Sequence, residues 1–341
     1  MAAPRPLTLF ETYKMRLRRR RLLWRSWRSR RQLTSLVNRT GDIGAADILA
    51  VVVLHNEAQR LPYFLAYYRR LGVAHFLMVD NASDDASVEM LLDQPDVSLW
   101  QTDKSYHASR FGLDWSTWLQ WKYARAHWCL TLDADEILVY SDHLQHDLHD
   151  LTNWLDRQGR RAFGALLLDL YPKGRLSKAS HRSGQDPTEV LNWFDPGPYR
   201  AEWQEPMGNL WVQGGLRERM FFADDPRRSP TLNKLPLVKW YHRFAYANST
   251  HAILPPELNH AYDGPGGEQP SGVLLHTKFL PQIVSRSASE KTRAQHFRAP
   301  QEFDRYYDDI IADPDLWHAG SVRLEGTRQL QGLGLMRGID W

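Results

Sequence analysis

Short apolar runs alternate with longer segments of helical periodicity between residues 48 and 171. The runs are ILAVVVL (48–54), HFLMV (75–79), VSLW (97–100), WCLTL (128–132) and AFGALLLDLY (162–171). Continuous apolar, β-branched runs are typical of parallel strands that are covered on both faces. Between them, apolar residues recur every three or four positions, as in PYFLAYYRR at 62–70. Strands and helices alternating in this way predict an α/β sheet built from right-handed crossovers.

The pattern changes after residue 171. Residues 172 to about 272 are rich in Pro, Gly, Trp and Arg, and their short apolar pieces predict loops and a smaller mixed sheet. GVLLHTKFL at 272–280 predicts a late strand, and residues 285–341 predict helices packed on the body. We therefore expect a main domain at 47–284, divided into halves at 47–171 and 172–284, followed by a C-terminal helical extension at 285–341.

Charge is distributed unevenly along the chain. The net charge is +3, but residues 1–41 carry twelve Lys or Arg against Glu11 alone, a net of +11, so the remainder carries 3 − 11 = −8. Apolar residues at helical spacing between Tyr13 and Leu33 predict that this basic arm forms a helix with a partly apolar stripe. Arg interleaved with Trp suits an anionic membrane surface. The alternative is a solvated basic helix packed on the acidic body, and nucleic acid is not the expected partner.

Cysteine content and hydropathy bear on the compartment. Cys129 is the only cysteine, so no intrachain disulfide can form, and the apolar run around it predicts a core position. No apolar stretch approaches the ~20 residues of a membrane span, and the N-terminus shows no secretory signal. We expect a cytoplasmic protein in a reducing compartment, and our hypothesis for the arm is peripheral attachment at the inner membrane face.

Polar clusters directly follow three of the predicted strands: Asn56-Glu57, Asp80-Asn81 and Asp133-Ala134-Asp135. Ligands of open α/β sheets bind outside the carboxyl ends of the strands, so these clusters should gather along one edge. In an extended segment the side chains of Asp133 and Asp135 would point the same way, and Glu136 elsewhere. Two close carboxylates repel unless a proton or a cation lies between them, and Mg²⁺ or Mn²⁺ with hard oxygen ligands is the natural occupant.

These motifs resemble those of family 2 glycosyltransferases with the A-type, nucleotide-sugar-binding fold. The resemblance is carried by Asn56-Glu57, Asp80-Asn81-x-Ser83-x-Asp85 and Asp133-Ala134-Asp135-Glu136, and it covers residues 47 to 278. The whole chain is similar to bacterial proteins identified as members of that family. The resemblance implies a mostly parallel, Rossmann-like sheet flanked by helices, with a smaller mixed sheet, a basic N-terminal helix and C-terminal helices. It also implies that 47–171 binds the nucleotide sugar and that 172–284 binds the acceptor.

The resemblance further implies roles for individual residues. The donor nucleotide would be bound by Asn56, Glu57, Asp80, Asn81, Asp84 and Asp133, with Asp84 or Asp85 at the rim of the pocket. A divalent ion, Mn²⁺ or Mg²⁺, would be held by Asp133, Asp135 and His276. The donor would be a nucleoside-diphosphate sugar, with UDP more expected than GDP. The acceptor would be a hydroxyl of a carbohydrate or lipid-linked substrate, as in the synthesis of surface polysaccharide or glycolipid.

Family 2 enzymes invert the anomeric centre in one displacement, which calls for one catalytic base. As the sugar leaves, a cation and nearby Arg or Lys stabilise the charge on the phosphate, and a carboxylate takes the acceptor proton. We expect Asp135 to act in catalysis through the metal and Glu218, in GGLRERMFF, to be the base. Asp169, Asp224 and Asp225 are the rival bases. They stay open because this region lacks the Glu-Asp pair after a Gly-Trp that marks the base in the better-known family pattern. Arg217 and Arg219 are candidates for phosphate binding.

Two other functions are compatible with parts of this pattern. A sugar nucleotidyltransferase also uses an α/β sheet and metal-binding aspartates, but it usually opens with a Gly-rich phosphate loop, and LHNEAQRLP has no glycine. A non-catalytic or membrane-docking protein could keep the fold and use only the basic arm. The intact Asp133 and Asp135 favour the transferase over a non-catalytic protein.

Overall fold

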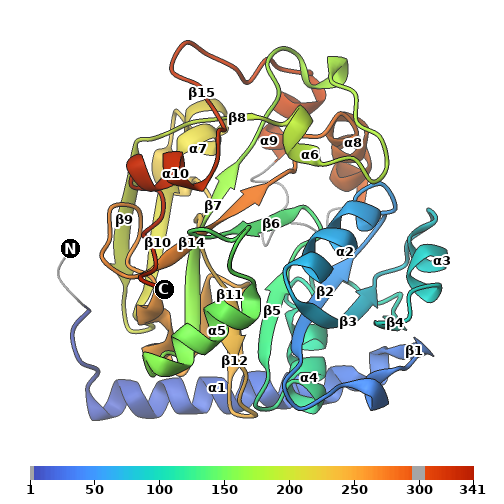
Figure 1. Cartoon of the computed structure of the whole chain (residues 1–341), viewed down its shortest axis with the longest axis vertical. Helices are drawn as coiled ribbons and strands as arrows, with labels where there is room; N and C mark the ends of the chain where they lie inside the picture. The colour runs from blue at the N-terminus through green and yellow to red at the C-terminus, as the bar shows by residue number, and fades with distance from the viewer. Residues whose placement is uncertain (1–3, 294–303) are drawn as a thin grey trace.

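The computed structural model describes residues 4–293 and 304–341 and is organised around one nine-stranded sheet (Figure 1). The strand order is β1-β4-β3-β2-β5-β11-β7-β14-β6. Their bounds are β1 Thr34–Val37, β2 Ile48–Leu54, β3 Val73–Asp80, β4 Val97–Gln101, β5 Trp128–Leu132, β6 Glu136–Val139, β7 Ala162–Asp169, β11 Asn233–Lys239 and β14 Ser271–His276. Strands β2, β3, β4, β5, β7 and β14 run in one direction, whereas β1, β11 and β6 run against their neighbours. The predicted mostly parallel sheet is confirmed.

The parallel strands end at a common edge. Leu54 at the end of β2 pairs with Asp80 of β3, which in turn pairs with Gln101 of β4. On the other side of β2, Val52 pairs with Leu132, the last residue of β5. This register brings the segments that follow β2, β3 and β5 to one edge of the sheet, as the alternation of apolar runs and polar clusters predicts.

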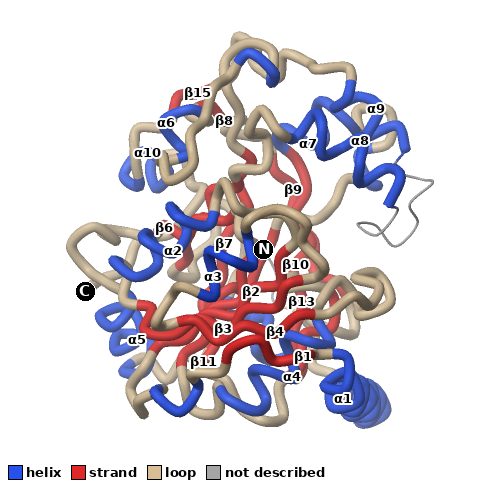
Figure 2. Tube along the Cα trace, turned by 90° about the vertical axis from the view of Figure 1, so that its right-hand side faces the viewer, coloured by secondary structure: helices blue, strands red, loops and turns tan. Residues whose placement is uncertain are grey.

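Helices cover both faces of the parallel strands. These are α2 (Leu61–Arg70), α3 (Ser87–Leu92), α4 (Leu113–Tyr123) and α5 (Leu148–Arg157). Figure 2 shows α2 and α3 on one side of the strands and α4 on the other. The helices change faces because the crossovers are right-handed and the direction of travel across the sheet reverses: the chain moves from β2 out to β4 and then returns to β5. Cys129 is fully buried in β5, in agreement with its predicted core position.

The second half of the chain is less regular. It contains α6 (Pro187–Val190), β8 (Trp193–Phe194), β9 (Tyr199–Gln204), β10 (Asn209–Gly214), α7 (Gly215–Phe221), β12 (Ala245–Asn248) and β13 (Ala252–Leu254). The small sheets are two-stranded and antiparallel, which replaces the predicted single mixed sheet. One segment of this half, β11, enters the main sheet between β5 and β7. The sequence pattern did not predict a central strand there.

Both ends of the described chain pack on this body. The predicted basic helix is α1 (Leu9–Ser29), whose first turn is closed by a capping box of Thr8 and Glu11. The C-terminal elements are α8 (Ile283–Arg293), α9 (Asp304–Ile311), β15 (Val322–Arg323) and α10 (Thr327–Gly332). Leu330, Leu335 and Ile339 lie in the main hydrophobic core. Among the helices described, none combines the length and the apolar character needed to cross a bilayer.

Candidate active site

The two aspartates of the predicted metal motif lie in a tight turn between β5 and β6. The turn is closed by the backbone N–H of Glu136, which donates to the carbonyl of Asp133 at 3.1 Å. The segment is therefore bent rather than extended, and the carboxylates of Asp133 and Asp135 face different partners. The expectation that they point the same way is not met, because the alternation of side chains holds only in extended backbone.

Asp135 begins a chain of buried ionic contacts. Its Oδ2 lies 3.2 Å from Nε2 of His276, and Nδ1 of the same ring lies 2.5 Å from Oδ1 of Asp169. Asp169 also accepts two hydrogen bonds from Arg217, at 2.7 Å from Nε and 2.9 Å from Nη2. The register explains the meeting, since His276 of β14 pairs with Asp169 of β7 on one side and with Glu136 of β6 on the other.

The charges of this chain shift one another's pKa values. Burial alone would raise the pKa of Asp135, but the facing His276 holds it well below its usual range. Burial would likewise raise the pKa of Asp169, and Arg217 with His276 lowers it instead. For His276 burial opposes protonation, yet the carboxylates of Asp135 and Asp169 outweigh it and raise the pKa of the ring. The cluster therefore carries alternating charges.

Two of the three predicted metal ligands are close enough to share an ion. Ligands about 2.1 Å from an octahedral ion stand about 3.0 Å apart when they are at right angles, close to the 3.2 Å between Asp135 and His276. Asp169 contacts the other ring nitrogen, which is the arrangement that orients metal-binding histidines. The third predicted ligand, Asp133, faces Lys234. Within the described parts of the chain, no three His, Cys, Asp or Glu side chains are grouped as a complete metal shell.

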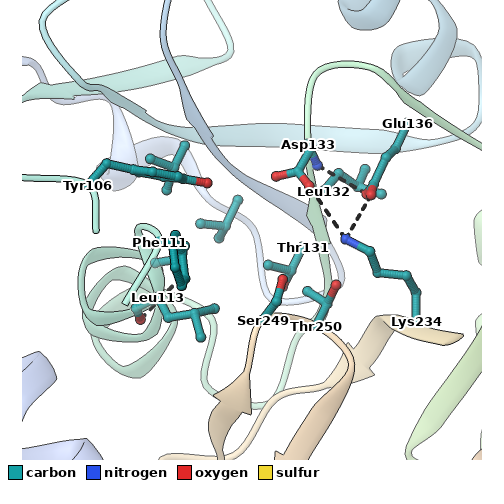
Figure 3. Close-up of a pocket in the computed structure, with 13 residues that line it drawn as sticks. Tyr106, Phe111, Leu113, Thr131, Leu132, Asp133, Glu136, Lys234, Ser249 and Thr250 are labelled. Carbon is teal, nitrogen blue, oxygen red and sulfur yellow. Dashed lines mark hydrogen bonds and ion pairs between the residues drawn. The ribbon is translucent and has the colours of Figure 1, made fainter. Parts of the chain in front are cut away.

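Lys234 of β11 is a site residue that the sequence reasoning missed. Its Nζ lies 2.8 Å from Oε1 of Glu136 and 3.4 Å from Oδ2 of Asp133, and the lysine side chain is only 6% exposed (Figure 3). Burial would lower the pKa of Lys234, but the facing carboxylates raise it. Burial raises the pKa of Glu136 to about 7. The signal in the sequence was a single Lys within the otherwise largely apolar stretch NKLPLV.

A cavity of about 50 Å³ opens beside Asp133 (Figure 3). Its walls combine aromatic, hydroxyl and charged side chains, and they include Tyr106, Phe111, Ser116, Thr131, Asp133, Glu136, Lys234, Ser249 and Thr250. A water needs roughly 10–15 Å³ of such volume, and pockets for whole ligands are roughly 300–1,000 Å³. The cavity is therefore large enough for a few waters or for one small group of a larger ligand, not for a nucleotide.

Asp80 is buried with one unsatisfied oxygen. Its Oδ2 accepts hydrogen bonds from the backbone of Ser83 and from Nε2 of Gln101, both at 3.1 Å. Its Oδ1 is buried and has no hydrogen-bond partner within the described structure. A buried acceptor without a partner costs free energy, so this oxygen is a good candidate for an N–H donor on a ligand.

The other predicted nucleotide-binding residues tie loops together at the same edge. Asn56, with a φ of 56°, exchanges two hydrogen bonds with Asp84, at 2.6 and 2.9 Å. Asn81 donates from its side chain to the carbonyls of Thr102 and Lys104. These contacts shape the loops that follow β2 and β3.

Glu57 joins this edge to the C-terminal part of the chain. It forms ion pairs with Arg60 at 2.9 Å and with Arg286 of α8 at 2.7 Å. Arg60 also donates to the carbonyls that follow β14, and the backbone of Thr277 there donates to the carbonyl of Asp135 at 2.8 Å. Glu57 is thus connected to the metal motif through two intervening groups.

The candidate bases lie in different surroundings. Glu218 of α7 pairs with Arg200 through Oε1 at 2.6 Å, while its Oε2 is buried without a hydrogen-bond partner in the described structure. Asp224 forms an exposed pair with Arg305. Asp169 is the rival base that the structure brings into the Asp135 cluster, and both its oxygens are occupied there.

The two arginines proposed for phosphate binding contact carboxylates instead. Arg217 binds Asp169, and Arg219 binds Asp195 at 2.7 Å. Both pairs hold α7 on the body, because Asp169 ends β7 and Asp195 follows β8. The structure thus brings Asp135, His276, Asp169 and Arg217 together and places Arg219 in a separate contact.

Comparisons with known proteins give only distant likenesses. No protein-family model matches the chain, and no curated protein matches its sequence. Among solved structures, a 4-diphosphocytidyl-2C-methyl-D-erythritol synthase is similar at 17% identity and a TM-score of 0.25, over 41% of this chain and 66% of that one. The mannosyltransferase PcManGT from Pyrobaculum calidifontis, in complex with GDP-Man and Mn²⁺, is similar at 14% identity and a TM-score of 0.31, over 90% of this chain and 82% of that one. Likenesses at this level carry no weight for function.

Proposed function

We propose that this protein is a metal-dependent glycosyltransferase that moves a sugar from a nucleoside diphosphate to a hydroxyl acceptor, with inversion at the anomeric carbon. The observation that carries the proposal is the pair of Asp135 and His276, which stand 3.2 Å apart at the carboxyl edge of the sheet. Asp80, with its unsatisfied buried oxygen, ends a strand at the same edge. A cation site and a polar acceptor at the same edge of the sheet suit a nucleoside diphosphate.

Asp135 and His276 would hold the divalent ion, and a carboxylate with an imidazole suits Mn²⁺ better than Mg²⁺. When bound, such an ion stabilises negative charge on phosphate oxygens. Asp169 keeps the His276 ring oriented through Nδ1, and Arg217 keeps Asp169 ionised. Asp133 would meet the ribose or the metal from the other side of the turn.

The nucleoside would lie over the loops after β2 and β3. Asp80 would accept a hydrogen bond from a base N–H through its free Oδ1, while Asn56, Glu57, Asn81 and Asp84 shape the surrounding loops. Uracil and guanine both present a ring N–H, so this contact fits either base. We propose a UDP sugar as the donor because the sequence resemblance favours it.

Glu218 would act as the catalytic base. Arg200 holds its Oε1, which leaves the buried Oε2 able to take a proton from the acceptor hydroxyl. A single displacement needs one such base, and no covalent nucleophile is required. The acceptor would approach from the irregular half of the chain, which carries α7.

The deciding experiment is calorimetric titration of the purified protein with UDP and with GDP, each with and without Mn²⁺. We expect one nucleotide to bind much more tightly with the metal than without it. Asp135→Ala should abolish that metal-dependent gain, because it removes one of the two adjacent ligands. Asp150→Asn is the matched control, since it changes an exposed carboxylate of α5 in a surface contact with His146. If neither nucleotide binds, or if the Asp135 variant binds as the native protein does, the proposal is wrong.

Donor turnover separates a working site from a binding site. In the absence of acceptor, we expect slow metal-dependent hydrolysis of the sugar nucleotide above the rate of the Asp135→Ala variant. Equal rates in both proteins, together with intact nucleotide binding, would instead indicate a non-catalytic binding protein.

A further inference from the structure

The helix α1 is fixed to the body by one narrow face. Met15, Leu22, Ser26 and Ser29 are its buried residues, and they pack toward α4 and β12. Ser29 Oγ donates to the carbonyl of Asp114 at 2.9 Å. Arg25 pairs with the nearly buried Asp114 carboxylate, also at 2.9 Å. The helix is therefore a docked element of the fold, about 30 Å long, rather than a free arm.

The same helix presents large apolar side chains to solvent. Its exposed members are Leu9 (92%), Phe10 (64%), Tyr13 (58%), Leu17 (44%), Trp24 (54%) and Trp27 (40%). Within the described parts of the chain these are six of fourteen exposed large hydrophobic residues, although α1 contributes only 21 residues. Scattered exposed apolar residues need no explanation, but a group of this kind on one element marks an interaction surface.

The exposed residues form a face of their own. At about 100° per residue, Phe10, Tyr13, Leu17, Trp24 and Trp27 project roughly 180° away from the buried residues Met15, Leu22, Ser26 and Ser29. We call these five residues the outer face of α1. By the same angle of about 100° per residue, Arg20, Arg21 and Arg28 lie within the outer face or next to it. The helix thus has one face buried against the body and, opposite to it, an exposed face of large apolar side chains.

Positive charge surrounds the outer face. The helix carries eight Lys or Arg and one acidic residue, Glu11, whose carboxylate is already bound by Arg5 and Thr8. Cations stand over its rings: Lys14 is 4.2 Å from the Phe10 centroid, Arg28 is 4.8 Å from Trp24 and Arg30 is 4.0 Å from Trp27. An anion-bearing partner would therefore meet both the rings and the cations.

The aromatic and basic character continues onto α4. Arg30 also lies 5.7 Å from the Trp118 ring, and Trp118 lies 5.2 Å from Trp121, which is 40% exposed. Lys122 is 5.9 Å from Trp118. In Figure 1, α1 runs along the lower edge of the molecule with α4 directly above it. Both helices can therefore contribute to one extended surface.

We propose that the outer face of α1 docks the protein on an anionic lipid bilayer, with the helix lying in the plane of the headgroups. Aromatic side chains favour the depth of the headgroups, and Lys or Arg around them are attracted by anionic lipid. Duplex nucleic acid would offer phosphates to the cations but no apolar surface on which to bury the side chains of the outer face. A second copy of the chain would bring two helices of net charge +7 together, which repel.

Co-sedimentation with lipid vesicles tests the charge requirement. The intact protein should pellet with vesicles of phosphatidylcholine and phosphatidylglycerol but not with phosphatidylcholine alone, and less at high salt. Arg20→Ala/Arg21→Ala should weaken binding about tenfold or more. The matched control, Arg323→Ala/Arg328→Ala, removes two exposed arginines from the β15–α10 region and should bind as the native protein does (Figure 1). Equal losses in the two variants would overturn the proposal.

A second pair of variants tests the rings. Trp24→Ala/Trp27→Ala should lose most of the vesicle binding, whereas Leu144→Ala, which removes an apolar side chain that is 82% exposed elsewhere, should not. Brominated lipid should quench tryptophan fluorescence in the native protein and less in the Trp24/Trp27 variant. Unchanged binding of that variant, or tighter binding of single-stranded DNA than of anionic vesicles, would contradict a membrane role. Nucleotide binding should be unaffected, so this test is independent of the proposed catalytic activity.

Discussion

Lys234 is a buried ammonium shared by two carboxylates of one turn. Its contacts with Glu136 and Asp133 leave little of the side chain in water. A cation in that position balances the negative charge of the turn that carries Asp135. Its removal would leave the carboxylates of Glu136 and Asp133 close together without a counter-charge. Breaking a buried pair costs far more than breaking an exposed one, because the remaining charge loses its partner without regaining water.

We expect Lys234→Met to lower the free energy of unfolding by about 3 kcal/mol or more. The matched control lies on the same strand: Lys239→Met breaks a more exposed pair with Asp156 and should cost about 1 kcal/mol or less. Urea denaturation of both variants at neutral pH measures the difference. Similar costs for the two lysines would mean that the Lys234 site is better hydrated than its burial indicates. The double variant Glu136→Gln/Lys234→Met should recover part of the loss.

The pKa of His276 gives the metal-free protein a pH-dependent stability. Because the pKa is raised in the folded state, the folded protein keeps a proton that the unfolded chain loses above about pH 6.5. This contribution is complete below pH 6.5 and is lost as the pH rises through the folded pKa. The lowered pKa values of Asp135 and Asp169 matter at acidic pH. Below about pH 4 the unfolded chain takes up protons that the folded carboxylates do not, so stability is lost as the pH falls.

In the presence of a chelator, the free energy of unfolding should therefore fall as the pH rises from about 6.5 through the folded pKa of His276, by at most about 1.4 kcal/mol per pH unit for one proton. His276→Gln should remove that slope, and His149→Gln, an exposed histidine of α5, should keep it. Denaturation curves across this range test the sign directly. A stability that rises with pH in the native protein would contradict the charge assignment of the cluster. Adding Mn²⁺ should reverse the trend, because metal binding requires a neutral ring.

At the scale of elements, α2 anchors the turn that carries the aspartates. Tyr68 accepts a hydrogen bond from the backbone of Leu138 and donates to the carbonyl of Glu136 at 2.9 Å. Tyr67 donates to the carbonyl of Leu138 at 2.6 Å. The apolar face of α2 thus covers the sheet while two hydroxyls satisfy the backbone of β6. The helix fixes the strand that begins at Glu136.

Gly214 makes the junction between β10 and α7 possible. Its φ is 138°, and a Cβ at this position would lie 2.1 Å from the carbonyl oxygen of Pro198. We expect Gly214→Ala to destabilise the protein by about 2 kcal/mol or more and to loosen α7, and with it Arg217 and Glu218. Gly332→Ala is the control, since a Cβ there meets no atom within 4 Å. Hydrogen exchange in α7 and denaturant unfolding report both effects, and equal behaviour of the two variants would disprove the steric argument.

At the scale of the whole molecule, the C-terminal segment completes the core. Trp154 of α5 donates to the carbonyl of Asp340 at 2.7 Å, and Trp341 stacks on His146 with centroids 4.1 Å apart. Ile339 is 6% exposed and packs in the main cluster of the sheet and its helices. The segment after residue 333 therefore packs into the core of the main body.

We expect Ile339→Ala to cost about 2–5 kcal/mol of unfolding free energy, as buried aliphatic truncations do. Leu333→Ala lies six residues away with 42% of its surface exposed, and it should change stability by less than about 0.5 kcal/mol. Thermal unfolding followed by circular dichroism should show one transition that moves to lower temperature only in the Ile339 variant. A separate early transition would indicate that the C-terminal segment unfolds independently.

The sequence by itself determined the main strands, the helices between them and the edge at which the polar clusters meet. This was possible because a strand buried on both faces and a helix with one buried face leave distinct local periods. Asp80 ends such a strand and the Asp133-Ala134-Asp135 segment directly follows another, so their place at the edge required no knowledge of distant contacts. The likeness of this pattern to nucleotide-sugar enzymes arose from the same local features.

Only the tertiary structure decided which distant residues meet there. β11 enters the sheet from the irregular half and brings Lys234 to a turn about one hundred positions earlier in the chain. His276 and Asp169 face each other because β14 pairs with β7, and the two aspartates diverge because their segment turns. Periodicity records whether a residue is buried but not what it is buried against. Long-range pairing depends on the packing of the whole sheet, and that packing sets the chemistry of the site.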